Sequence, residues 1–65
     1  MKNAENFIQQ EMQKRLDLIN DESFRIKSIE IAKKIGITAD EWNKNKSVIL
    51  MYFANEYFSI LNKIN

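Results

Sequence analysis

The sequence predicts an all-α protein, a small bundle of three helices packed around an apolar C-terminal helix. Three observations support this fold class. Apolar residues recur at three- and four-residue steps over most of the chain, as they do on one face of a helix. The 65 residues include no proline and a single glycine, so few positions interrupt a helix. Short polar clusters and the glycine divide the chain into three segments, which we expect to form one domain over residues 1–65.

The first helix is expected over residues 3–19. Its apolar side chains fall at helical spacing, and glutamines and charged residues occupy the opposite side. The apolar positions are Ala4, Phe7, Ile8, Met12, Leu16 and Ile19. Leu18 lies outside this stripe. The polar residues 20–23 follow, and their side chains suit the start of a new helix.

The second helix is expected over residues 22–35, although its isoleucines also suit a strand. Its apolar positions are Ile26, Ile29, Ala32 or Lys33, and Ile35, with Phe24 and Ile31 at the flanks. Lys33 and Lys34 favour the helix, because cations stabilise a last turn. Gly36 suits the left-handed residue that often follows a helix.

The third helix is expected over residues 39–64. Thr38 and Glu41 fit a capping box, in which each side chain bonds the backbone amide of the other residue. Asparagine is a poor residue for a helix interior, so a break near residues 43–46 would divide this helix and give a fourth.

The segment from residue 47 onward is apolar on nearly every side, which predicts burial on every side. Two short helices of the same chain are too small to bury every side of such a helix. We therefore expect a homodimer or a tight complex with another protein, with a better-covered monomer as the alternative.

The composition excludes several classes of function. The chain has neither cysteine nor histidine, which removes disulfides, the usual zinc sites and the base that activates a nucleophilic hydroxyl. Gly36 alone makes no phosphate-binding loop. We expect no enzyme activity, no cofactor and no metal. The longest apolar run falls far short of the roughly 20 residues that cross a bilayer, and the first residues lack a signal-peptide core. The expected location is therefore the cytoplasm, without membrane binding.

The favoured function is a small regulatory or adaptor protein that associates with itself or with another protein through an apolar and aromatic helical surface. Tyrosine and tryptophan are enriched at protein interfaces. The residues expected at the interface are Trp42, Met51, Tyr52 and Phe58.

Residues 26–46 also resemble a divergent helix-turn-helix, a motif of transcriptional and phage-type regulators. Gly36 takes the turn, apolar residues precede it, and Trp42 offers an anchor in the second helix of the motif. The resemblance implies that this second helix enters the major groove of DNA. The residues that would contact DNA are Lys33, Asn43, Lys44, Asn45 and Lys46.

The charge distribution disfavours DNA as the partner. Asp40 and Glu41 occupy the first turn of the second helix of the motif, where the phosphate backbone would repel them. Asn45 stands where the motif usually has an apolar residue. The net charge of the chain is only +1, below the basic character typical of DNA-binding domains. Nucleic acid is therefore the less favoured partner.

Overall fold

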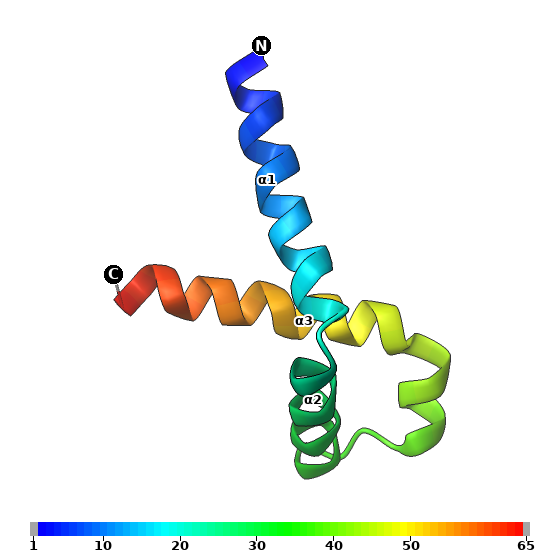
Figure 1. Cartoon of the computed structure of the whole chain (residues 1–65). Coiled ribbons are helices and arrows are strands. Elements are labelled where there is room, and N and C mark those ends of the chain that lie inside the picture. Colours follow the sequence, from blue (N-terminus) through cyan, green and yellow to red (C-terminus); the bar gives the residue numbers. More distant parts are fainter. Residues whose placement is uncertain (1, 65) are drawn as a thin grey trace.

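The computed structural model describes the backbone of residues 2–64 and the side chains of residues 4–64. It consists of three helices, α1 (Lys2–Ile19), α2 (Glu22–Lys34) and α3 (Ala39–Ile64), and this part of the chain contains no strand. Figure 1 shows α1 and α2 on opposite sides of α3, which both of them contact near its middle. The prediction of an all-α bundle packed around the C-terminal helix is confirmed.

The connection between α1 and α2 is fixed by two polar side chains. The Asp21 carboxylate accepts a hydrogen bond from the Phe24 backbone amide at 2.9 Å and so caps the start of α2. Arg25 Nε donates to the carbonyl of Ile19 at 2.6 Å. That bond satisfies one of the carbonyls that the end of α1 leaves without a helical partner.

Gly36 forms the turn between α2 and α3. Its φ is +94°, a left-handed conformation in which a side chain would be strained. The Gly36 amide donates to the carbonyl of Lys33 at 3.2 Å, and the Ile37 amide donates to the carbonyl of Ala32 at 2.9 Å. These two bonds make a Schellman motif, the helix ending that the lone glycine predicts.

Thr38 and Glu41 form the predicted capping box at the start of α3. The Glu41 amide donates to the Thr38 hydroxyl, and the Thr38 amide donates to the Glu41 carboxylate, both at 3.1 Å. The Thr38 hydroxyl donates to the same carboxylate at 2.9 Å. The bond from the Thr38 amide, followed by that from its hydroxyl, holds the pKa of Glu41 below its ordinary value of 4.5.

The helix α3 bends at Asn45, inside the range predicted for a break. This residue has φ −121° and ψ 23°, outside the helical region. Its side-chain amide donates to the carbonyl of Glu41 at 3.3 Å, in competition with the regular backbone ladder. Figure 1 shows the chain turning a corner there. The helix therefore has a short first part, residues 39–44, and a long second part, residues 46–64.

The core is small and lies where both parts of α3 pack against the rest of the chain. Its buried apolar residues are Ala32, Trp42, Leu50 and Ala54. Leu50 is 2 % exposed and packs with Ala32 and Trp42. Ala32 and the buried Ser28 are small side chains, which lets α2 lie close to α3.

Arg15 holds α1 to α3 at the crossing. Its Nε donates to Asn55 Oδ1 at 2.6 Å, and its guanidinium lies 5.2 Å from the centre of the Phe58 ring. Glu11 accepts hydrogen bonds from Lys14 and Arg15, which lower the pKa of the Glu11 carboxyl. All of these contacts lie in the second half of α1.

The apolar stripe of α1 is not buried along its length, which corrects the simplest picture drawn from its periodicity. The helix crosses α3 instead of lying along it, so its first half projects from the body (Figure 1). Phe7, Ile8 and Met12 are exposed, whereas Leu18, outside the stripe, is half-buried. The periodicity identifies the helix but not the part of it that the chain itself covers.

The capping box makes stability depend on pH. Because the pKa of Glu41 is lower in the folded chain than its ordinary value, the ionised carboxylate stabilises the fold above about pH 4.5. This contribution disappears as the pH falls through the folded-state pKa. Replacing Thr38 by Val removes the hydroxyl donor, so we expect the pKa of Glu41 to rise toward its ordinary value. Titration of the carboxyl carbon by NMR measures this shift.

Thr38→Ser is the matched control, because it keeps the hydroxyl and should keep the pKa of Glu41 low. If Thr38→Val leaves that pKa unchanged in a chain that is still helical, the hydroxyl does not contribute as described.

Candidate protein-binding surface

Much of the apolar surface of the chain lies outside the core. Twelve large apolar side chains of the described residues are exposed, against four apolar residues that are buried. The accessible surface is 5405 Å², whereas a compact monomer of this mass exposes about 4,300 Å². Scattered exposed apolar residues are normal, but contiguous apolar patches mark binding sites. Whether these exposed side chains form a contiguous patch therefore decides whether they mark a binding site.

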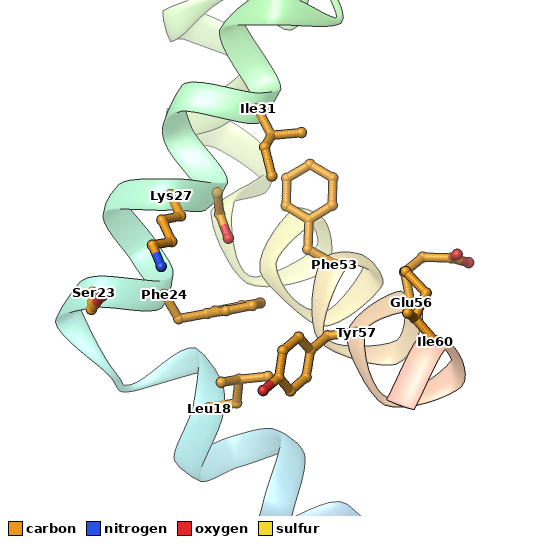
Figure 2. A pocket seen from close by; sticks show the side chains of 10 residues that line it. Leu18, Ser23, Phe24, Lys27, Ile31, Phe53, Glu56, Tyr57 and Ile60 are labelled. Atoms are coloured by element: carbon orange, nitrogen blue, oxygen red, sulfur yellow. The ribbon is translucent and has the colours of Figure 1, made fainter. Parts of the chain in front are cut away.

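A groove with a volume of about 440 Å³ runs between α2 and the second part of α3, as Figure 2 shows. Its lining residues are Leu18, Ser23, Phe24, Lys27, Ser28, Ile31, Phe53, Glu56, Tyr57 and Ile60. In Figure 2, Phe24 and Tyr57 meet at the end nearest Leu18 of α1, and Phe53 and Ile31 lie farther along. The groove is therefore mainly apolar and aromatic.

Helical spacing brings these side chains onto two facing walls. On α2, the residues that line the groove lie three or four positions apart, from Phe24 to Ile31, and on α3 they do so from Phe53 to Ile60. The rings of Phe24 and Tyr57 pack edge to face, with centroids 6.2 Å apart. This contact joins the two walls at one end and leaves the rest of the groove open.

The two walls of the groove carry opposite charges. Lys27 lies on the α2 wall and Glu56 on the α3 wall, and both are exposed. Ser28 is buried in the groove, and no buried side-chain polar atom of the described residues lacks a hydrogen-bond partner. The groove thus presents an apolar floor between one basic and one acidic edge, with no unsatisfied polar group beneath.

Trp42, predicted at the interface, lies in the core instead. It is 8 % exposed and packs with Ala32 and Leu50. The turn at Gly36 and the cap at Thr38 send the start of α3 back toward α2, which directs the indole inward. Trp42 therefore contributes to folding and not to an accessible surface.

The other three predicted interface residues lie outside the groove. Tyr52 is 61 % exposed, and its ring lies 5.9 Å from that of Phe53. Met51 is half-buried, and Phe58 is half-buried beneath the guanidinium of Arg15. Their role in binding stays a prediction.

The groove itself was not predicted from the sequence. The sequence pattern puts Phe24 and Ile31 at the flanks of the second helix, away from the stripe through Ile26 and Ile29. Their seven-residue spacing puts them on one face, so α2 has two apolar faces instead of one. A second apolar face on a short helix is the signal that could have indicated a second contact surface.

The residues predicted to contact DNA are exposed, but they belong to a surface of mixed charge. Lys44 Nζ lies 3.2 Å from the Asp40 carboxylate, with both side chains more than 70 % exposed. The Asn45 amide is bonded to the Glu41 carbonyl at the bend. Lys33, Asn43 and Lys46 are exposed around the same turn. The basic side chains therefore share this surface with Asp40 and Glu41.

The described residues contain no group of three or more His, Cys, Asp or Glu side chains placed to hold a metal ion. None of the helices described is long and apolar enough to span a bilayer.

No protein-family model, curated protein or solved structure matches this chain.

We expect no micromolar binding to random-sequence duplex DNA, because Asp40 and Glu41 lie on the surface that would face the phosphates. A fluorescence-anisotropy titration at about 50 and 200 mM salt tests this, since a protein with 6–10 phosphate contacts loses about 10³–10⁵ in affinity between those salts. Salt-sensitive micromolar binding, abolished by Lys44→Glu with Lys46→Glu, would contradict this expectation and establish the helix-turn-helix.

Proposed function

We propose that the protein is a small, non-enzymatic, cytoplasmic adaptor or regulator that binds an amphipathic helix of a protein in the groove between α2 and α3. The observation that carries the proposal is the floor of the groove. Phe24 and Phe53 are half-buried there, and Tyr57 is 44 % exposed, between two helical walls (Figure 2). Aromatic side chains of this kind dominate the energetics of protein interfaces.

The form of the groove favours a helix as the bound segment. A helix binds such a groove with apolar side chains three, four and seven residues apart. The lining residues of each wall span seven positions, or about 10 Å of helix, which matches about two turns of a bound helix. Extended peptides usually bind by adding a strand to a sheet edge, and the part of the chain described has no sheet.

The edges of the groove supply affinity and selectivity. Ile31 and Ile60 are 48 % and 53 % exposed, so a bound helix would bury roughly half of each side chain and gain about 1 kcal/mol from each. Lys27 and Glu56 favour a helix with an acidic group on one side and a basic group on the other. Such pairs at an exposed rim select orientation more than they add affinity.

Selection from a phage-displayed library of amphipathic helices, with the protein immobilised, tests this proposal. We expect selected helices to carry apolar residues at helical spacing and to bind Ile60→Glu at least about tenfold more weakly than wild type, because a charge replaces an apolar contact.

Val48→Glu is the matched control, because Val48 is 71 % exposed on the same helix and does not line the groove. It should bind the selected helices as well as wild type. Helices that bind both variants equally well, or a selection that yields no apolar helix, would contradict the proposal.

A further inference from the structure

We propose that the helix held in this groove is the segment of α1 that carries Ile8, Met12 and Leu16 from a second copy of the chain, and that two copies insert these segments into each other reciprocally. The inference rests on the function proposed for the groove and names the partner. It joins two apolar surfaces of one chain, the groove and the stripe of α1, that the chain cannot bring together itself.

The amount of exposed surface matches what one interface buries. The chain exposes 5405 Å², about 1,100 Å² more than the roughly 4,300 Å² expected of a compact monomer. Its radius of gyration is 13.5 Å, whereas a compact domain of this length has about 10.7 Å. A stable interface of standard size buries about 800 Å² on each partner. The accessible surface that pairing with one further copy would bury is therefore comparable to this excess of about 1,100 Å².

The apolar stripe of α1 has the properties required of the bound helix. Phe7, Ile8 and Met12 are 64 %, 55 % and 57 % exposed, and the last two are separated by one helical turn. With Leu16, which is 41 % exposed, the stripe from Ile8 spans about 12 Å, close to the length of the groove walls.

The same chain cannot fill its own groove. Figure 1 shows the first half of α1 projecting on one side of α3, while α2, and with it the groove, lies on the other. Arg15 fixes this direction through the hydrogen bond from its Nε to Asn55 Oδ1 on α3, at 2.6 Å. Insertion must therefore come from another copy. When each copy supplies one stripe and one groove, the pair closes on a two-fold axis and leaves no free end.

Mixing of two variants tests the reciprocal arrangement by sedimentation equilibrium. Met12→Lys alters the stripe and Ile60→Glu alters the groove, at positions already more than half exposed. Each change damages both contacts of a homodimer, so we expect each variant alone to dimerise about 100-fold more weakly than wild type. Mixed one to one, they should form a heterodimer, because one contact is then wild type and the other pairs Lys with Glu.

Gln13→Lys and Ile26→Glu are the matched controls, since they add the same charges to exposed positions outside the stripe and the groove. Both should dimerise as wild type does. Variants that stay monomeric when mixed would overturn the reciprocal insertion, as would a wild-type protein that is monomeric or that forms chains longer than dimers.

Engineered cysteines give a readout that does not depend on how the charged variants fold. The chain contains no cysteine, so Met12→Cys in one sample and Ile60→Cys in another can form only defined disulfides. A disulfide requires Cα atoms within about 7 Å. We expect the mixed disulfide to form faster than either homodimeric one. Preference for a homodimeric disulfide would overturn the arrangement. The helix selection, repeated with Met12→Lys, whose groove is unchanged and whose own stripe no longer inserts, tests the groove separately.

Discussion

The burial of one long apolar helix by two shorter ones, at a single crossing, is the constraint on which the rest of this structure depends. The second part of α3 packs around Leu50, where small side chains such as Ala32 let α2 come close. Because α1 crosses α3 instead of running beside it, the contact is short, and both helices extend beyond it (Figure 1). A core this small contributes little net stability in a chain of 65 residues. It also leaves exposed the groove between α2 and α3 and the apolar stripe of α1, the two surfaces that the proposals use.

Polar side chains at the connections, more than the core, set the directions of the helices. Arg15 fixes the angle at which α1 leaves α3, Arg25 ties the end of α1 to α2, and the Asn45 amide stabilises the bend in α3. The Schellman turn at Gly36 then returns the chain so that Trp42 can reach the core. The contact between Phe24 and Tyr57 closes one end of the groove that lies between α2 and α3.

Local features of the structure could be predicted from the sequence, and the directions of its elements could not. The capping box of Thr38, the glycine turn and the bend at Asn45 depend on residues within one turn of each other, so their signals are visible in a short window. The contact of Arg15 with Asn55 joins residues 40 positions apart and has no such signal. For the same reason the sequence assigned Trp42 to an exposed surface and did not show which of the two apolar faces of α2 lies against α3.

The central claim is that association completes the burial that one chain leaves unfinished. It is tested most directly by the dependence of the thermal unfolding midpoint on protein concentration, followed by circular dichroism at 222 nm over an about 100-fold range. If folding is coupled to association, the midpoint rises steadily with concentration, because dilution favours the separated and less stable chains. A midpoint that stays constant over that range, at a single two-state transition, would show that the chain is stable alone and would contradict the account.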